Sequence, residues 1–473
     1  MNVQKLPPTW FRAGVIAVLT FGLAAPALPD TLADTLKRAY QLSPRLDASR
    51  ANLRALDEGV AQARAGRRPT IIASANAQQS ASITDDLGSD VIDNTTITGQ
   101  ITAELTLYDG GQTRSAIEAS QAVVAAGRAN LKSVEQTLFL DAVTAYVDIR
   151  RDQAFVSLGR SNVEVLQQQV QAANDRFELG EVTRTDVSLA EARLAAAQSQ
   201  LVSFIGQLNI SNEVFEAVVG VPPRSLAPPP PLPQLPGTVT GAEAIAMQEN
   251  PAMIAARFNE VAAQFNVERA RGAKRLSVTA DLTGSIRNQD VGSPTVGPRA
   301  TTSSLQAGVT ASYPLYTGGS LESAVREAQA SLAEQRFNVQ DTARGVKQQT
   351  ATAWATLEIA RAQIVANREQ VRAARIAFEG VREEATLGAR TTLDVLDLEQ
   401  DLRDAQVELA SSVRDEYVAA YSLLSAMGLL TLEKLNLGIP AYDPDLYYSK
   451  VQDGPFFTVR GRKLDALIEK LGR

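Results

Sequence analysis

Four segments of the chain alternate apolar and polar residues with a period of two. From Ile97 to Leu107 the odd-numbered positions are apolar or small, and the even-numbered positions are threonine, glutamine or glutamate. The segments 305–315 and 276–286 alternate in the same way, and the segment 70–80 does so more weakly. This period predicts four β-strands, each with an apolar and a polar face. Strands of about 10 to 12 residues are long enough to cross an outer membrane when tilted, but two half-buried hairpins of a soluble domain fit the local pattern equally well.

Long polar segments separate the two strands of each pair. Residues 81–95 and 287–302 are rich in Asp, Gly, Ser and Thr, and we predict that they are loops. Long polar loops on one side and short turns on the other are typical of barrels that face the outside of a cell.

A helical period follows the second strand of each pair. About 65 residues pass without proline over 115–179 and again over 323–387, which corresponds to two rods of roughly 100 Å. Apolar residues recur along each rod at alternating spacings of three and four, and this pattern resumes after Gly180 and Gly388. The heptad spacing predicts two antiparallel coiled-coil hairpins.

The chain consists of two similar halves. The motif 107–111, Leu-Tyr-Asp-Gly-Gly, returns 208 positions later (315 − 107) as Leu-Tyr-Thr-Gly-Gly, and a helical segment at 32–64 or 242–272 precedes the strands of each half. A repeat this long is a duplicated half and not a solenoid unit. The expected divisions are a signal peptide (1–27), a first repeat (28–220), a Pro-rich linker (221–237), a second repeat (238–436) and a C-terminal tail (437–473). The strand-to-helix corners are expected at Gly110, Gly111, Gly318 and Gly319.

The N-terminus has the pattern of an export signal. Lys5 and Arg12 precede an apolar stretch over 13–25, and Ala25-Pro26-Ala27 is a candidate cleavage site. An N-terminal membrane anchor is the alternative, but the apolar stretch is shorter than the ~20 residues of a spanning helix. No later segment is a convincing hydrophobic spanning helix, so entry into a membrane would require strands.

Cysteine and histidine are absent from the chain. Disulfides, thiol and imidazole catalysis and His/Cys metal sites are therefore excluded, and no other catalytic constellation stands out. We expect no enzyme, no cofactor and no metal site. The net charge of −7 becomes −9 without residues 1–27, which contain two basic residues and no acidic ones, so nucleic acid is not an expected partner.

The second inter-helix turn, 388–397, reads Gly-Ala-Arg-Thr-Thr-Leu-Asp-Val-Leu-Asp. Together with the matching turn 180–186, the Tyr-x-Gly-Gly corners and the duplication, it resembles the TolC family of outer-membrane channel proteins over nearly the whole mature chain. Residues 437–440, Leu-Gly-Ile-Pro, and 442–444, Tyr-Asp-Pro, resemble the tail of members that serve type I secretion. The absence of cysteine excludes the lipoprotein branch of the family.

The resemblance implies a mixed α+β membrane protein. Three chains would form one twelve-stranded β-barrel, four strands per chain, continued by a long antiparallel α-helical coiled-coil barrel, with the tail 437–473 packed at the equatorial region. The physics of a sheet in lipid also requires an oligomer, because four strands alone would leave two unpaired edges. The implied function is an exit duct for type I protein secretion, multidrug efflux or both. Its implied location is the outer membrane of a Gram-negative bacterium, extending into the periplasm.

At the periplasmic tip, the resemblance assigns Asp394 and Asp397 to a ring of carboxylates around the aperture. Such a ring predicts cation selectivity and block by multivalent cations. Asp186 and Asp394 also fit capping boxes with the threonines three residues before them, and capping explains these two aspartates equally well. Asp397 lies one turn later, where Leu189 stands in the first half, so capping does not require it.

The contacts that the resemblance implies for closing the tip involve Arg390, Asp186 and Thr185. A further closing hydrogen bond of the family pairs a tyrosine with a glutamine, where this chain has Ala385 and Asp175. That bond cannot form here. Either the contact between Arg390 and Asp186 then provides more of the stability of the closed tip, or the resting tip is less tightly closed than in other members of the family.

The turns at Gly180 and Gly388 are implied to dock a periplasmic adaptor protein. The other implied partners are two further copies of the chain, outer-membrane lipid and an inner-membrane ABC or proton-driven transporter. Opening would untwist the hairpins when a partner binds. The rival prediction is an exported coiled-coil structural protein or adhesin without a pore.

Overall fold

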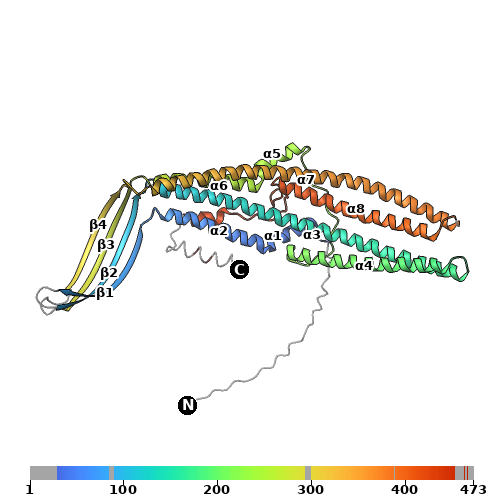
Figure 1. The fold of residues 1–473 in the computed structure, drawn as a ribbon, viewed down its shortest axis with the longest axis horizontal. Helices are drawn as coiled ribbons and strands as arrows, with labels where there is room; N and C mark the ends of the chain where they lie inside the picture. Colours follow the sequence, from blue (N-terminus) through green and yellow to red (C-terminus); the bar gives the residue numbers. More distant parts are fainter. Residues whose placement is uncertain are drawn as a thin grey trace, which may run out of the picture.

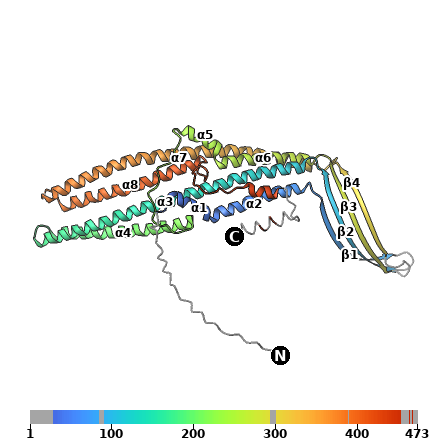
Figure 2. The ribbon, with the colours of Figure 1, turned by 180° about the vertical axis from the view of Figure 1, so that it is seen from behind.

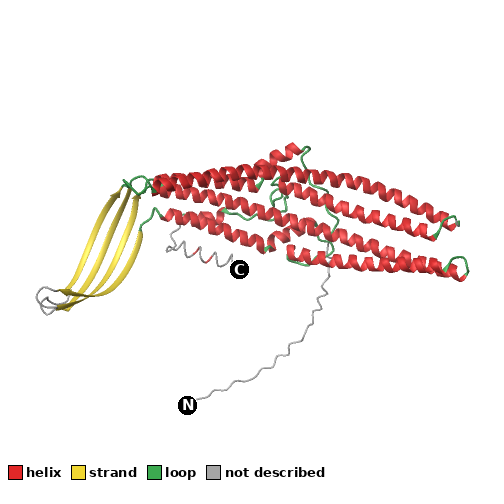
Figure 3. Ribbon diagram, viewed as in Figure 1, coloured by secondary structure: helices red, strands yellow, loops and turns green. Residues whose placement is uncertain are grey.

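The computed structural model of the chain describes residues 29–84, 90–292, 300–387 and 389–452, together with residues 463 and 466. The predicted signal peptide therefore lies outside the described residues. The described part is elongated, with a four-stranded sheet at one end and the turns of two helical hairpins at the other (Figure 1, Figure 3). Among its helices, none combines the length and the apolar character that a membrane-spanning helix needs.

The four period-two segments form one antiparallel sheet with the strand order β1-β2-β3-β4. The strands are β1 (Thr70–Thr84), β2 (Asp90–Tyr108), β3 (Ser277–Gly292) and β4 (Ala300–Ser312). The register aligns their apolar positions, because Ala73, Ile101, Gly284 and Leu305 form one row across the sheet. Since side chains alternate between the faces, one face of the sheet is mainly apolar and the other mainly polar. The prediction of four two-faced strands is confirmed.

The ends of the strands differ from the prediction. Most of the predicted loops 81–95 and 287–302 belongs to strands, because the antiparallel ladder continues through these polar, threonine-rich segments. Backbone hydrogen bonds hold such a ladder together whether or not the side chains are apolar. In contrast, β4 ends at Ser312, before the predicted end at Leu315. Pro314 has no N–H to donate to the ladder, which explains the earlier end.

Two pairs of long antiparallel helices form the hairpins that the heptad spacing predicts (Figure 1). The first hairpin consists of α3 (Gln112–Glu178) and α4 (Arg184–Val219), and the second of α7 (Ser320–Thr386) and α8 (Thr392–Ala426). Both α3 and α7 contain 67 residues. At a rise of 1.5 Å per residue each is about 100 Å long, as predicted.

The helical segments that precede the strands are each broken in two, although the sequence predicts one helix in each place. The observed helices are α1 (Leu32–Leu42), α2 (Pro44–Ala65), α5 (Val239–Glu249) and α6 (Pro251–Gly272). Pro44 and Pro251 begin α2 and α6, and the side chains of Ser43 and Asn250 cap these helices. The residue before a proline avoids helical backbone angles, so α1 and α5 end there.

The helix α3 is central to the chain. It packs against α2 and α6 toward the sheet, and against α4 and α8 toward the hairpin turns. The helix α7 packs against α6 and then against α8, so it forms one edge of the helical layer along its length (Figure 2). The opposite edge consists of α2 and α4.

The main hydrophobic core lies at mid-length of α3, where α1, the inter-repeat linker and the end of α8 meet it. Phe139 and Tyr146 of α3 are fully buried there, together with Leu423 of α8. The hydroxyl of Tyr146 donates to the carbonyl oxygens of Asp30 (3.1 Å) and Ala227 (2.6 Å). These bonds fix the linker and the start of the described chain to the core.

The last described helix, α9 (Asp445–Val451), packs against α2. Asp445 pairs with Arg128 of α3 (2.6 Å), and the hydroxyl of Tyr447 donates to Glu58 of α2 (2.6 Å). Close to these groups the side chain of Asp57 is 2% exposed. Burial raises the pKa of its carboxyl to about 6; Arg128 opposes this shift, and the carboxylates of Glu58 and Asp445 add to it.

Replacing Asp57 with asparagine is expected to stabilise the protein more at pH 8 than at pH 5. The folded carboxyl has a pKa of about 6, above its ordinary value of 3.8, so the stability that its proton provides is complete below 3.8 and is lost as the pH rises through 6. The resulting penalty at pH 8 is about 3 kcal/mol. Thermal unfolding of the wild type and D57N at the two pH values measures it, and an equal gain at both would contradict the expectation.

Candidate functional site

The two inter-helix turns lie at the end of the molecule away from the sheet (Figure 1). In the first turn, Gly180 adopts a φ of 76°, which ends α3 and reverses the chain. The hydroxyl of Thr183 accepts the N–H of Asp186 (3.3 Å), and the carboxylate of Asp186 accepts the N–H of Thr183 (2.9 Å). Thr185 is exposed beside this capping box.

The second turn repeats the capping box of the first. The hydroxyl of Thr391 accepts the N–H of Asp394 (3.3 Å), and the carboxylate of Asp394 accepts the N–H of Thr391 (3.0 Å). Arg390 donates to Glu384 at the end of α7 (2.8 Å). Gly388 lies outside the described residues.

Both capping carboxylates are anionic at neutral pH. Backbone hydrogen bonds from Thr183 and Thr391, followed by the bonds from their hydroxyls, hold the pKa of Asp186 and Asp394 below the ordinary value. These aspartates therefore cap α4 and α8, as the capping interpretation requires. In the part of the chain that the structure describes, no group of three or more acidic side chains has an arrangement that could hold a metal ion.

Asp397 has a different environment from Asp394. Its carboxylate accepts a hydrogen bond from Arg193 of α4 at 2.7 Å, and the two side chains are 54% and 40% exposed. This ion pair joins the second hairpin to the first. Asp397 therefore combines a position near the turn with a contact between hairpins.

The structure of one chain brings only some of the predicted tip residues together. Arg390 pairs with Glu384 of its own hairpin, and among the described residues no bond joins it to Asp186. The predicted closing contact between Arg390 and Asp186 stays a prediction for the assembled protein.

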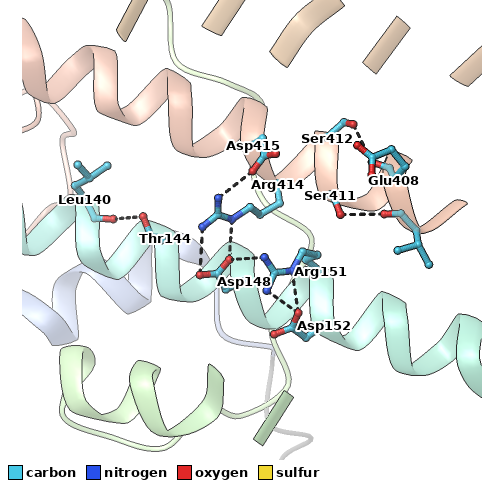
Figure 4. A network of polar contacts seen from close by, with 11 residues as sticks. Leu140, Thr144, Asp148, Arg151, Asp152, Glu408, Ser411, Ser412, Arg414 and Asp415 are labelled. Carbon is cyan, nitrogen blue, oxygen red and sulfur yellow. Dashed lines mark hydrogen bonds and ion pairs between the residues drawn. The ribbon is translucent and has the colours of Figure 1, made fainter. Parts of the chain in front are cut away.

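A polar network joins the hairpins near the core (Figure 4). Asp148 of α3 accepts from Arg414 of α8 (2.7 Å) and pairs with Arg151 (3.3 Å). Arg151 also pairs with Asp152 (2.8 Å), whose buried carboxylate accepts from Ser211 of α4 (2.6 Å). The network thus links α3, α4 and α8 on the sheet side of the hairpin turns.

A second polar contact joins the hairpins, and the sequence does not predict it. Glu399 of α8 is only 3% exposed, and its carboxylate accepts from Gln169 of α3 (2.6 Å) and Arg403 (2.9 Å). The spacing of Leu396, Glu399 and Arg403 by three and four is a helical stripe of its own. This stripe does not appear in the apolar heptad pattern, because two of its three members are charged.

At the strand-to-helix corners, Gly110 and Gly111 adopt φ values of 70° and 92°, and Gly318 and Gly319 values of 65° and 81°. These four glycines lie between the second strand and the long helix of each half. A side chain at Gly110 would collide with the carbonyl oxygen of Gly272, whereas one at Gly318 or Gly319 would meet no atom of the chain within 4 Å. The first corner is therefore packed, and the second is open.

The chain is similar to outer-membrane export proteins over most of its length. The family model described as "Outer membrane efflux protein" matches residues 35–221 and 244–429. The outer membrane efflux protein BepC of Brucella suis biovar 1 is 35% identical over 427 residues, which cover 90% of this chain and 91% of BepC. The outer membrane protein TolC of Escherichia coli is 23% identical over 438 residues, which cover 89% of this chain and 87% of TolC.

The fold is similar to that of solved outer-membrane channels. The crystal structure of VceC from Vibrio cholerae superposes with a TM-score of 0.68 at 23% identity, covering 84% of this chain and 96% of VceC. These similarities do not support the rival prediction of a structural coiled-coil protein without a pore. The chain belongs to the outer membrane efflux protein family, to which TolC also belongs, and it is an outer-membrane channel protein of efflux or type I secretion.

Proposed function

We propose that three copies of this chain assemble head to tail into one channel. Their sheets would close into a twelve-stranded barrel in the outer membrane, and their hairpins into a helical tunnel that extends into the periplasm. The observation that carries the proposal is a sheet with two open edges and an exposed apolar face.

Within the described chain, β1 pairs only with β2, and β4 only with β3. On the apolar face, Ile101 is 58% exposed, Leu305 78% and Val309 69%. In lipid this face is favourable, but each unpaired backbone group at an open edge costs several kcal/mol. Joining β4 of one copy to β1 of the next removes both edges.

The duplication indicates how neighbouring copies meet. Arg275, at the end of α6, donates to the carbonyl oxygen of Gly110 in the packed corner (3.1 Å). Its counterpart in the first half is Arg68 (275 − 207), at the end of α2, and the counterpart of Gly110 is Gly318 (110 + 208). Arg68 lies at the edge that β1 and α2 form, and the open corner at Gly318 lies at the edge of β4 and α7. In a ring, Arg68 of each copy would donate to Gly318 of its neighbour.

Replacing Arg68 with alanine is expected to weaken the assembly while leaving the fold of each chain intact. A hydrogen bond from a charged donor contributes about 1.5 to 3 kcal/mol, and a trimer would lose three of them. Heating the detergent-solubilised protein and following its dissociation by gel electrophoresis checks this. As a comparison, R275A removes the bond within the chain and is expected to lower the stability of the fold. An R68A protein that dissociates at the wild-type temperature would contradict the head-to-tail contact.

The hairpin turns would form the periplasmic mouth of the channel. Asp394 and Asp397 from three copies would surround the aperture, and contacts of Arg390 with Asp186 and Thr185 would close it. A periplasmic adaptor would dock at the two inter-helix turns, at Gly180 and Gly388. An inner-membrane ABC or proton-driven transporter would supply the cargo. We also propose the division of the chain that the sequence predicts. It consists of a signal peptide (1–27), two repeats (28–220 and 238–436), a linker between them (221–237) and a tail at the equatorial region (437–473).

Planar-bilayer recording of the purified mature protein tests the proposed channel. We expect discrete conductance steps that favour cations, because the mouth carries ionised carboxylates. Addition of a multivalent cation from the periplasmic side should reduce the current. A detergent-purified protein that inserts but passes no current would contradict the proposal.

A further inference from the structure

The apolar face of the sheet ends in tyrosines where the strands meet the helices. A bulge in β2 between Thr106 and Tyr108 brings Tyr108 opposite Val278 of β3, which lies on the apolar face. Tyr108 is 48% exposed there, and Tyr313, directly after β4, is 60% exposed. Tyrosine is enriched where a barrel meets the headgroups of a membrane, because its ring is apolar and its hydroxyl is polar. In the proposed barrel, the strand-to-helix corners therefore lie at the level of the headgroups.

Two basic residues precede β1 and β3 at this level. They are Arg67 and Arg68 before β1, and Lys274 and Arg275 before β3, and the two pairs are related by the duplication (274 − 207, 275 − 207). Arg275 donates to the carbonyl oxygen of Gly110, and Arg68 is its counterpart in the proposed contact between copies. The other two, Arg67 and Lys274, differ in the residue that stands opposite them.

A carboxylate balances Lys274, whereas a second cation stands opposite Arg67. Lys274 pairs with Glu322 at the start of α7 (3.0 Å). The residue of the first half that corresponds to Glu322 is Arg114, at the start of α3 (322 − 208). The position that holds an ion pair in the second corner therefore holds two arginines in the first.

The two arginines come from chain segments that are in contact. A Cβ atom at Gly66 would lie 3.2 Å from the hydroxyl oxygen of Thr113, so the end of α2 meets the start of α3 one residue before each arginine. Within the described chain Arg67 is exposed and forms no ion pair. Arg114 is 75% exposed and pairs with Glu118 of its own helix (3.0 Å). One carboxylate thus faces two guanidinium groups.

The carboxylate of Asp109, in the same corner, is bound elsewhere. It accepts the N–H of Gly111 (3.0 Å) and the N–H of Thr113 (2.6 Å) at the start of α3. These bonds satisfy the exposed amides of the helix end, where a negative charge is favourable. The first corner therefore retains an excess of positive charge at Arg67 and Arg114.

Both arginines lie on the side of the helical layer that carries α9. Arg114 and Gln121 are seven residues apart on α3 and share one helix face, and Gln121 donates to the hydroxyl of Tyr448 in α9 (3.4 Å). On α2, Arg64 donates to the carbonyl oxygen directly after α9 (3.1 Å), and Arg67 follows one turn nearer to the sheet. A conducting channel needs an open lumen, so the side that carries the tail is the outer side of the wall.

We propose that Arg67 and Arg114 of each chain bind the headgroup of an anionic phospholipid in the periplasmic leaflet of the outer membrane. The inference rests on the proposed barrel, which places the corner at this leaflet. A guanidinium group donates two parallel N–H bonds to phosphate oxygens, and two such groups suit one phosphodiester. The second corner binds no such lipid, because Glu322 already neutralises Lys274 there.

Native mass spectrometry of the detergent-extracted mature protein tests the site. The probes are dioleoylphosphatidylglycerol, which is anionic, and dioleoylphosphatidylcholine, which has the same acyl chains and no net charge. We expect the wild-type oligomer to retain phosphatidylglycerol about tenfold or more in preference to phosphatidylcholine, because two cations act on each headgroup. Equal retention of the two lipids would overturn the proposal.

The variant R114E gives the first corner the ion pair of the second. Its carboxylate would pair with Arg67, and we expect the preference for phosphatidylglycerol to disappear. R67Q and R114Q each remove one cation and should lower the preference about threefold to fivefold. The matched control is R271Q, which changes the charge equally at the end of α6, because Arg271 is already paired with Glu268 (2.7 Å). Equal effects of R114Q and R271Q would contradict the assignment.

Excess inorganic phosphate distinguishes a lipid site from a general anion site. We expect it to leave phosphatidylglycerol in place, since the acyl chains also hold the lipid on the apolar face; displacement by phosphate would exclude a lipid site. The same spectra report assembly, and if R114E does not assemble, R67Q and R114Q provide the result. A wild-type trimer without lipid preference contradicts this inference alone, whereas a wild type that remains a single chain contradicts the proposed assembly.

Discussion

Replacing both Asp394 and Asp397 with asparagine is expected to abolish the cation selectivity of the channel and its block by multivalent cations. In three assembled chains these residues would place six carboxyl groups around one aperture. Asp394 is ionised because its capping bonds lower its pKa. The charge of Asp397 is partly offset by its ion pair with Arg193. A ring of carboxylates concentrates cations at a pore mouth, so its removal should weaken multivalent block by about tenfold or more.

The two single variants distinguish the roles of these carboxylates. D394N should reduce the selectivity of the resting channel more than D397N, because Asp397 is already paired with Arg193. D401N is the matched control, since Asp401 is exposed on the same helix one turn farther from the aperture. Recording reversal potentials in a salt gradient gives the selectivity of each variant. If the double variant retains the wild-type selectivity, the assignment of the aperture to these residues is wrong.

Replacing Ile101 with arginine is expected to prevent stable insertion into the outer membrane, whereas the same change at the next residue, Thr102, should be tolerated. Ile101 lies in the apolar row with Ala73 and Gly284 and is 58% exposed, while Thr102 pairs with Thr283 on the polar face. An arginine on the lipid face near the bilayer midplane costs about 2 to 4 kcal/mol in each chain, and a trimer carries three.

The amount of oligomer in washed outer-membrane fractions measures this effect. The comparison is sharp because the two positions are neighbours in β2 and differ only in the face of the sheet they occupy. We expect T102R to reach the wild-type amount and to reduce cation current through the added positive charge. If I101R also reaches the wild-type amount, the apolar face is not in contact with lipid.

Much of the architecture follows from the spacing of apolar residues, because a spacing of two is specific to a strand and a spacing of three and four to a helix. The period of two places Ile101 and Leu282 on one face before any register is known, and the heptads after Gly180 give the antiparallel hairpins. The helix boundary at Pro44 does not follow from the apolar spacing, because it arises from the residue before a proline, which disfavours helical backbone angles. The spacing of apolar residues therefore predicts which face of a helix or strand is apolar, but it does not predict where the element begins and ends.

The candidate site was less predictable, because its contacts join elements that are distant in sequence. Asp394 and Asp186 were expected at the turns, and the structure places them in capping boxes there. The partner of Asp397 could not be deduced, since Arg193 is one of several arginines on the first hairpin. The burial of Glu399 does not follow from the sequence, because a buried and a solvated glutamate cannot be distinguished before their partners are known.

The mass of the detergent-extracted mature protein tests the central claim most directly. We expect a complex of three chains in native mass spectrometry, since only a closed ring removes the open edges of β1 and β4 and covers the corner at Gly318. A stable single chain that remains in solution without detergent would contradict it.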